Sequence, residues 1–270
     1  MSSLRTVSTP MAHGVSLSKQ QSPTTAEEIA IAQKFPYREI VGSLMYLMTS
    51  TRPDIAYAVG QLSRFNDCHR SAHHAAAKHL LRYLRGTYSK GITFGQFNTE
   101  PIGFCDSSWA SDKDNGRSVT GYVFFMAGGP VSWRSKTQST VALSTAQAEY
   151  QALCAATQEA IHQRLLSCEL DSSLHSERSV IIFEDNQACI AMSENPINHE
   201  KTKHIFLKYH FIRECVLNKR IEVLYLSTKL MIADLLTKPT EVHISRELGP
   251  SLLGCTDVKT HVSSCLSINY

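Results

Sequence analysis

The chain alternates between stretches in which apolar residues recur at helical spacing and stretches in which they run together as in strands. Residues 1–35 show neither pattern and are rich in Ser, Thr and Gln, which predicts an irregular lead-in. Residues 36–95 show the helical pattern. Pro36 and Pro53 each suit the first turn of a helix, and a third helix, from about His74 to Arg85, ends at Gly86, a residue type that favours a helix C-terminus. This part of the chain is therefore predicted to be a small, mainly helical segment.

Strand-like patterns begin near residue 100. IGFCD at 102–106 and VIIFED at 180–185 are short apolar runs that end in an acid, and residues 119–126 and 130–135 flank a Gly-Gly pair as in an antiparallel hairpin. The remaining predicted elements are a long helix at 144–168, a short helix after 185, a helix at 202–218, a strand at 221–226 and a last helix from Leu230. The order βββαβααβα predicts an α/β unit with a mixed sheet over residues 100–240. Residues 241–270 lack periodicity and are predicted to be a tail.

Composition narrows the class of protein. Apolar residues make up 43% of the 270 residues and charged residues 19%, which is typical of a globular protein and excludes a disordered chain or a fibre. No run of 18 apolar residues occurs, so we expect no membrane partner, and the start of the chain lacks the apolar core of a secretory signal. The eight cysteines include no CxxC pair, so we interpret them as small buried side chains in a reducing compartment.

Four acidic residues occur at positions that favour a catalytic or metal-binding role over a merely solvated one. Asp106 and Asp185 directly follow apolar strands, and Glu149 and Asp234 lie within predicted helices. A charge at the end of a buried strand is costly unless it meets a cation or hydrogen-bond donors. Taken singly, each acid could be structural or solvated; the set of four, in this order of elements, is what indicates a shared site.

Convergent carboxylates favour the hydrolysis of phosphodiesters. Two divalent ions about 4 Å apart can activate the attacking water and stabilise the leaving oxygen, and carboxylates are the hard oxygen ligands that Mg²⁺ prefers. Four acids brought together without a cation would repel one another strongly. The pattern therefore predicts a metal-dependent nuclease.

Several long stretches resemble the ribonuclease H domain of copia-type retrotransposon polyproteins. They are IGFCDSSWASDKDNGRSVTGYVFFMAGGPVSWRSKTQSTVALSTAQAEYQAL, FEDNQACIAM, KTKHIFLKYHFIRE and STKLMIADLLTKP. Upstream, PYREIVGSLMYLMTSTRPDIAYAVGQLSRF and AAKHLLRYLRGT are similar to the segment that joins the reverse transcriptase of that family to its ribonuclease H. The resemblance covers about residues 35–240, and its motifs are long and jointly specific.

The resemblance implies a fold, an activity and a partner. The fold is α/β and ribonuclease H-like, with a five-stranded mixed sheet and flanking helices, preceded by the small helical segment. The activity is that of an endonuclease that cuts the RNA strand of RNA–DNA hybrids with two divalent ions, Mg²⁺ or Mn²⁺. The implied catalytic and metal-binding residues are Asp106, Glu149, Asp185 and Asp234. The implied partners are the hybrid and the reverse transcriptase domains of the polyprotein.

The sequence also departs from the family pattern. Ser108, Phe206 and Leu230 stand where the family usually has acidic residues, and Gln147 stands where it usually has Glu. None of these changes removes a predicted metal ligand. The Tyr-x-Asp-Asp signature of a reverse transcriptase is absent, so we expect no polymerase active site in this chain.

Basic and amide side chains near the acids are the candidates for substrate contact. The segment 199–220 contains six Lys or Arg and two Glu, and a similar excess of positive charge occurs at 64–90. Such clusters are either solvated helix faces or surfaces that contact phosphates without reading sequence. Amides suit the 2′-hydroxyls that distinguish RNA. The predicted contact residues are Asn186, Gln187, Lys203, His204, His210, Arg213 and Lys229.

Two other functions compete with the nuclease. One is a nucleic-acid-binding remnant of a truncated retroelement that keeps the fold but not catalysis. The other is a transposase or integrase of the same general fold, which is disfavoured because those enzymes typically end their acidic set with Glu, whereas this set ends with Asp234. For the nuclease we expect a cytoplasmic location, within a virus-like particle where the element is active, or a nuclear one.

Overall fold

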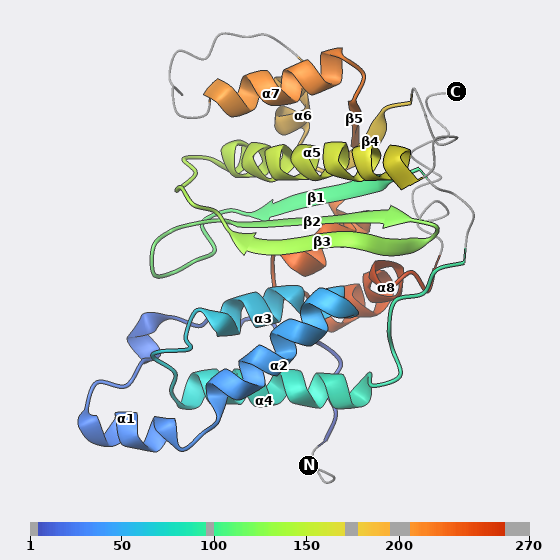
Figure 1. The fold of residues 1–270 in the computed structure, drawn as a ribbon. Coiled ribbons are helices and arrows are strands. Elements are labelled where there is room, and N and C mark those ends of the chain that lie inside the picture. The colour runs from blue at the N-terminus through green and yellow to red at the C-terminus, as the bar shows by residue number, and fades with distance from the viewer. Residues whose placement is uncertain (1–4, 96–99, 171–177, 195–205, 257–270) are drawn as a thin grey trace.

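The computed structural model describes residues 5–95, 100–170, 178–194 and 206–256. Its centre is a five-stranded sheet in the order β3-β2-β1-β4-β5 (Figure 1). The strands are β1 (Ile102–Ser108), β2 (Val119–Met126), β3 (Gly129–Thr137), β4 (Val180–Glu184) and β5 (Ile221–Tyr225). The β1–β2 and β2–β3 pairs are antiparallel, whereas β1–β4 and β4–β5 are parallel. The predicted α/β class with a five-stranded mixed sheet is confirmed.

The hairpin between β2 and β3 follows from its turn residues. Ala127 and Gly128 have φ angles of 50° and 77°. Positive φ at both central residues matches the tight two-residue turns that suit the twist of antiparallel strands. The hairpin carries a register shift between Phe124 and Phe125, and β3 extends to Thr137, two residues beyond its predicted end.

One face of the sheet is covered by three helices. They are α5 (Thr145–Leu170), α6 (Gln187–Glu194) and α7 (Phe206–Leu217). The apolar core on this face contains Phe124 from β2, Leu153 from α5 and Ile212 from α7, all fully buried. The rings of Tyr150 and Tyr209 stack with centroids 4.3 Å apart and so join α5 to α7. This packing fixes the start of α5, where Glu149 lies.

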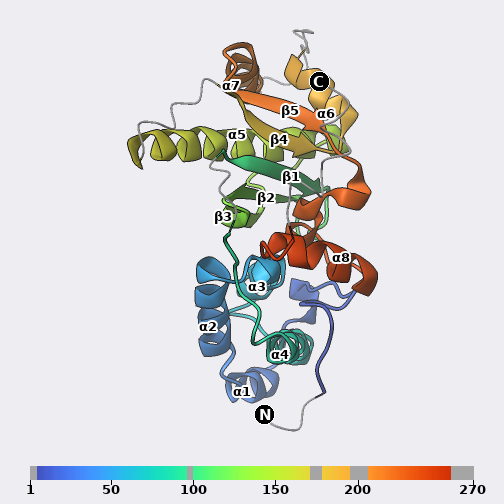
Figure 2. The same ribbon diagram turned by 90° about the vertical axis from the view of Figure 1, so that its right-hand side faces the viewer.

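The opposite face is covered by C-terminal and N-terminal parts of the chain together. The 3-10 turn η5 (Ile232–Leu236) and the helix α8 (Val242–Leu252) pack on it, and its core includes the aromatic cluster of Phe104, Phe125 and Phe183. The helical segment reaches the same face, because Trp133 Nε1 donates a hydrogen bond of 2.9 Å to the Met48 carbonyl oxygen. Figure 2 shows the resulting layers: α5–α7, the sheet, and the helical segment.

The helical segment has an apolar core of its own. Its elements are η1 (Lys19–Gln21), α1 (Ala26–Gln33), α2 (Tyr37–Ser50), η2 (Pro53–Ile55), α3 (Ala56–Ser63) and α4 (Ser71–Gly86). Buried side chains from α2, α3 and α4 meet in this core, among them Val41, Leu62 and Leu80. These bounds agree with the predicted starts of helices after Pro36 and at Pro53, and with the predicted helix end at Gly86. The helix α4 begins at Ser71, however, rather than at His74.

Three local predictions were wrong. The lead-in is not irregular throughout, because Thr25 caps α1 by accepting a hydrogen bond from Glu28 N, and Met11 and Leu17 join the core of the segment. The tail prediction fails at 242–252, where α8 buries Leu248 and Leu252. The last predicted helix is instead a pair of 3-10 turns, η4 (Thr228–Leu230) and η5. For α8 and the 3-10 turns, tertiary packing that local periodicity does not report decides the structure, whereas α1 begins at a local cap.

No helix among the described residues combines the length and the apolar character needed to cross a membrane.

Candidate metal centre

The sheet brings three of the four predicted acids together. Asp106 and Asp185 each lie two residues beyond Phe104 and Phe183, which pair across the parallel strands β1 and β4. Glu149 projects from the first turns of α5, which packs over β1. One carboxylate oxygen from each of Asp106, Glu149 and Asp185 lies within 4.8 Å of the others. A single cation could contact all three.

These carboxylates are buried, so the repulsion between their charges is little screened by solvent. Asp106 is 2% exposed and Glu149 is 6% exposed. Burial, followed by repulsion from Glu184, Asp106 and Asp185, raises the pKa of Glu149 to about 10, and burial also raises the pKa of Asp185. Glu149 Oε2 is buried without a hydrogen-bond partner among the described residues. Oxygen ligands that repel one another, one of them without a donor, fit a divalent cation.

Two hydroxyl groups orient the acids from outside the cluster. Thr237 Oγ1 donates a hydrogen bond to Asp106 Oδ2. Thr228 Oγ1 donates one of 2.6 Å to Asp185 Oδ2. Hydrogen bonds of this kind fix a ligating carboxylate and are a common outer layer of metal sites.

Asp234 lies beside the three acids but pairs with a lysine. It is 5% exposed in η5, and Lys238 Nζ lies 2.8 Å from Asp234 Oδ1 and 3.9 Å from Asp106 Oδ2. Burial and then the Asp106 charge raise the pKa of Asp234 to about 7, while Lys238 opposes the shift. The structure therefore places an ammonium group between the first and the fourth predicted acids.

A fifth acid lies beneath the cluster. Glu184 is fully buried; Cys105 Sγ donates to its Oε2 at 3.0 Å and Asn186 N to its Oε1 at 3.2 Å. Burial raises its pKa well above the ordinary value. Sequence reasoning missed Glu184 because it was interpreted as part of an apolar strand. The sequence signal that could have identified this acid is the continuous apolar run at 180–183 directly before it, which is typical of a strand covered on both faces.

The residues predicted to contact substrate differ in exposure, and some of them make contacts within the protein. Asn186 Oδ1 accepts a hydrogen bond of 3.0 Å from Cys189 N and so caps α6, and Gln187, next to it, is exposed. Arg213 Nε donates to the Met192 carbonyl oxygen at 3.4 Å and its guanidinium lies over the Tyr209 ring. Exposed positions are also found for His210 on α7 and Lys229 in η4. Lys203 and His204 lie outside the described residues.

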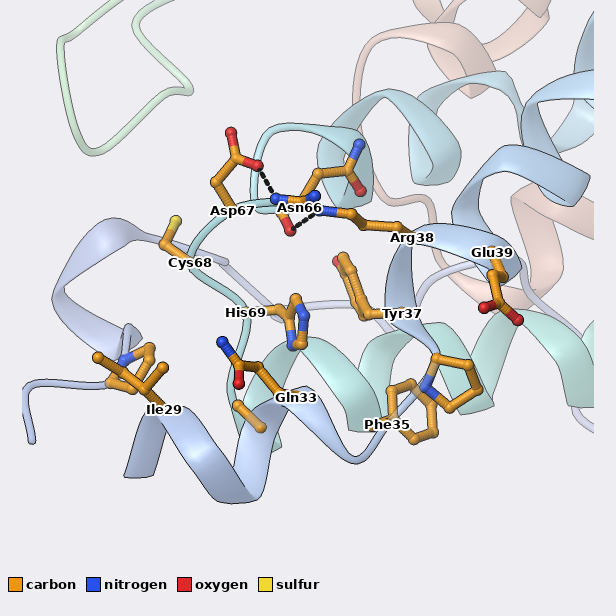
Figure 3. Close-up of a pocket in the computed structure, with 13 residues that line it drawn as sticks. Ile29, Gln33, Phe35, Tyr37, Arg38, Glu39, Asn66, Asp67, Cys68 and His69 are labelled. Carbon is orange, nitrogen blue, oxygen red and sulfur yellow. Dashed lines mark hydrogen bonds and ion pairs between the residues drawn. The ribbon is translucent and has the colours of Figure 1, made fainter. Parts of the chain in front are cut away.

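A separate cavity lies in the helical segment and contains none of the predicted site residues (Figure 3). It has a volume of about 420 Å³ and is lined by α1, the start of α2 and the turn after α3. Two of its charged groups pair with each other, because Arg38 binds Asp67, and Arg38 also donates to the Asn66 carbonyl oxygen at 3.1 Å. The ring of Tyr37 stacks on His69 with centroids 4.6 Å apart.

Known proteins similar to this chain are polyproteins of retrotransposons. The chain is 45% identical over 240 residues to the retrovirus-related Pol polyprotein from transposon TNT 1-94 of Nicotiana tabacum, covering 88% of this chain and 18% of the polyprotein. It is 37% identical, over 88% of its own length and 16% of the relative, to the Pol polyprotein from transposon RE1 of Arabidopsis thaliana. The chain thus spans less than a fifth of these curated relatives. No family model matches it.

Among solved structures, LC11 ribonuclease H1 from compost is similar in fold, with a TM-score of 0.39 and 16% identity. The match covers 52% of this chain and 93% of that protein. The relatives, by contrast, align with nearly the whole chain, including both the helical segment and the part that forms the five-stranded sheet. Over most of its length the chain is homologous to retrovirus-related Pol polyproteins of copia-type retrotransposons.

Proposed function

We propose that residues 100–240 hydrolyse the RNA strand of RNA–DNA hybrids, as the ribonuclease H part of a Pol polyprotein. The observation that carries the proposal is the convergence of Asp106, Glu149 and Asp185, whose carboxylate oxygens lie within 4.8 Å of one another at the end of the sheet. The expected partners are the hybrid and the reverse transcriptase domains of the same polyprotein.

The three acids would hold a divalent ion, Mg²⁺ or Mn²⁺. When bound, divalent ions would lower the pKa of the attacking water and neutralise charge on the departing 3′ oxygen. The protein contributes the placement of the oxygens, because Thr237 and Thr228 fix the orientations of Asp106 and Asp185. The orphaned Glu149 Oε2 supplies an acceptor that no donor of the described chain satisfies.

Asp234 would act as the fourth acid, close to Asp106. In the described conformation Lys238 neutralises this pair from 2.8 Å and 3.9 Å. For Asp234 to contact a cation directly, the lysine side chain has to move. Its side chain is 39% exposed, so solvent is available to receive the ammonium group.

The test is cleavage of a labelled RNA–DNA hybrid by the purified protein in Mg²⁺ or Mn²⁺, with an Asp185→Asn variant beside it. We expect the wild-type protein to cut the RNA strand, leaving 5′-phosphate and 3′-hydroxyl ends, and the variant to be inactive. Single-stranded RNA and duplex DNA of the same sequence are the substrate controls.

Two results would redirect the proposal. Binding of the hybrid without cleavage, in a wild-type protein whose circular dichroism shows an intact fold, would indicate a non-catalytic nucleic-acid-binding remnant. Joining of DNA ends to a target duplex would indicate strand-transfer chemistry instead.

A further inference from the structure

The buried side chain of Glu184 links the two strands that carry the aspartates of the metal centre. The strands β1 and β4 are parallel neighbours; Cys105 directly precedes Asp106 on β1, and Glu184 directly precedes Asp185 at the end of β4. Cys105 Sγ donates a hydrogen bond to Glu184 Oε2 at 3.0 Å. Both side chains are fully buried, so water does not compete for this contact.

The other oxygen of the same carboxylate holds the backbone that follows Asp185. Asn186 N donates to Glu184 Oε1 at 3.2 Å. The Asn186 side chain in turn accepts a hydrogen bond of 3.0 Å from Cys189 N in the first turn of α6. One carboxylate therefore connects β1, next to Asp106, with the turn that sets the direction of Asp185.

Glu184 also lies close to the third acid of the centre. Burial has the largest effect on the pKa of Glu149, and of the acids that raise it further, Glu184 acts more strongly than Asp106 or Asp185. The helix α5, which carries Glu149, packs on the same face of the sheet as Cys105. The elements that carry all three clustered acids thus meet at Glu184.

The contacts of Glu184 indicate that it acts through the clustered acids. Among the described residues, the carboxylate oxygens within 4.8 Å of one another belong to Asp106, Glu149 and Asp185. Both oxygens of Glu184 are occupied by donors of the protein, Cys105 Sγ and Asn186 N. Outer groups that hold ligands by hydrogen bonds determine how far apart those ligands lie.

The spacing of carboxylates decides which divalent ion they suit. Mg²⁺ requires near-ideal octahedral geometry with oxygens at about 2.0 to 2.1 Å, whereas Ca²⁺ accepts more ligands, at about 2.3 to 2.6 Å, in a flexible arrangement. A site whose strand ends are held together therefore favours the smaller ion. A site whose strand ends can separate loses Mg²⁺ more readily than Ca²⁺.

We propose that Glu184 is a positioning residue that fixes the spacing of Asp106 and Asp185 and so makes the centre select Mg²⁺ over Ca²⁺. Cys105 is its partner on β1, because its thiol anchors one oxygen of the carboxylate. The inference rests on the proposed function for the presence of a divalent ion at these acids.

The experiment measures ion selectivity without nucleic acid. Metal-free full-length protein is titrated with Mg²⁺ and with Ca²⁺ by isothermal titration calorimetry. We expect Cys105→Ala to weaken Mg²⁺ binding about tenfold, as the loss of an outer hydrogen-bond partner does. Ca²⁺ binding should weaken by less than about threefold, because Ca²⁺ tolerates longer and more variable distances. Cys105→Ser keeps a donor at this position and should restore the wild-type ratio of the two dissociation constants.

Glu184→Gln tests the other partner of the contact. Glutamine has the size of glutamate but one acceptor oxygen instead of two, so it can accept from only one of the two donors. The ratio of the dissociation constants should shift towards Ca²⁺, as in Cys105→Ala. Since Glu184→Gln also removes a charge, which affects both ions, the ratio and not the single affinity is the measure.

A matched control separates positioning from packing. Cys215→Ala removes a thiol of α7 that is 2% exposed in the same apolar core. It should lower the melting temperature much as Cys105→Ala does and leave both ion affinities unchanged.

An unchanged ratio in both Cys105→Ala and Glu184→Gln would overturn the inference, and so would an equal shift in Cys215→Ala. Failure of the proposed function gives a different result. A wild-type protein that selects Mg²⁺, loses this selectivity in the two variants and cuts no hybrid would keep the role of Glu184 and lose the nuclease. A wild-type protein that cuts hybrids while the variants keep its selectivity would do the reverse.

Discussion

Glu149 has a strongly raised pKa among the residues of the metal centre. Its pKa is raised from the ordinary 4.5 to about 10, first by burial and then by the neighbouring acids. Between these values the folded protein holds a proton that the unfolded chain releases. The contribution of Glu149 to stability without metal is therefore greatest at low pH and falls as pH rises from 4.5 to about 10. Asp234, with a pKa raised to about 7, acts in the same direction between its ordinary value of 3.8 and 7.

The first prediction concerns the thermal stability of the metal-free protein. In EDTA, we expect the melting temperature to fall between pH 5 and pH 8, and Glu149→Gln to flatten this fall and to melt above the wild-type protein at pH 8. Each kcal/mol of free energy of unfolding corresponds to about 2 to 4 °C for a chain of this size. Differential scanning calorimetry at matched ionic strength measures the effect. A Glu149→Gln variant with the pH dependence of wild type would contradict it.

The second prediction concerns the added cation. Mg²⁺ or Mn²⁺ binds the folded carboxylates and not the unfolded chain, so the metal should raise the melting temperature of the wild-type protein at pH 8. A concentration of 100 times the dissociation constant would add about 2.7 kcal/mol. Asp185→Asn and Glu149→Gln should lose most of this rise. An equal rise in these variants would show that the ion binds elsewhere.

Lys238 provides a third prediction at the scale of the residue. Although burial lowers the pKa of Lys238, the charges of Asp106 and Asp234 raise it, so the side chain is an ammonium group held by both acids. A cation that uses these acids competes with it. We expect Lys238→Gln to tighten Mn²⁺ binding several-fold, of the order that one displaced charge-assisted hydrogen bond produces, as measured by isothermal titration calorimetry. Weaker binding would instead make Lys238 a support for the metal centre.

The sequence located the acids better than it located their neighbours. Asp106 and Asp185 could be predicted because an acid directly after an apolar strand is conspicuous in the pattern itself. Lys238 was not predicted, because its contact with Asp106 joins residues 132 positions apart and depends on how η5 packs on the sheet. Glu184 was missed because its burial depends on helices covering both faces of β4.

At the scale of the element, η2 is fixed by a buried ion pair. Arg52 binds Asp54 through two hydrogen bonds of 2.9 Å and 2.8 Å, and Tyr83 Oη on α4 donates to the same carboxylate at 2.7 Å. Arg52 also donates to the Thr87 carbonyl oxygen at 3.1 Å. The pair therefore joins the turn between α2 and α3 to the end of α4.

The fourth prediction follows from the difference between buried and exposed pairs. Arg52→Met leaves Asp54 buried without its cation and should lower the free energy of unfolding by about 3 to 5 kcal/mol. The matched control is Arg38→Met, whose pair with Asp67 has side chains 68% and 86% exposed; its effect should be below about 1 kcal/mol. Urea unfolding followed by circular dichroism measures both. Equal effects of the two variants would contradict the assignment.

Elements were predictable where their own sequence determines them. The sheet strands and the long helix α5 were predicted because apolar runs and length mark them directly. The helix α8 was not, because it contains Gly249 and Pro250, which usually end helices, and because its stability comes from burying Leu248 and Leu252, the latter in the core on the η5 face of the sheet. The cap at Thr25 with Glu28 is a start signal for α1 that lies in the sequence and was overlooked.

At the scale of the whole molecule, the helical segment and the sheet share an interface. Arg64 at the end of α3 contacts Asp112 at 2.5 Å and Asp114 at 3.2 Å in the loop between β1 and β2. Ala56 lies in the apolar core on the same face of the sheet as Phe104, and Trp133 on β3 bonds to the Met48 carbonyl oxygen. The sequence indicated two regions with different patterns, but the contacts between them depend on side chains far apart in the chain and could not be predicted.

These contacts lead to the fifth prediction, that the two regions unfold as one cooperative unit. Of the two tryptophans of the chain, Trp133 bonds to Met48 across the interface, so the fluorescence is recorded from Trp109 in Trp133→Phe versions of the proteins, where it reports on the sheet region alone. Ellipticity at 222 nm reports on all helices, including those of the segment. We expect the two signals to give the same midpoint in urea for the wild-type protein, as two-state unfolding requires.

The interface variant Arg64→Ala decides whether the coincidence reflects real coupling. The substitution leaves Asp112, which is 3% exposed, without its cation. It should lower the free energy of unfolding by about 1 to 3 kcal/mol and shift both urea midpoints down together. If the ellipticity falls first while tryptophan fluorescence holds, in either protein, the helical segment melts independently. The sheet and its carboxylates would then form a self-sufficient unit. Coincident midpoints that shift together would instead mean that the metal centre depends for its stability on the helical segment.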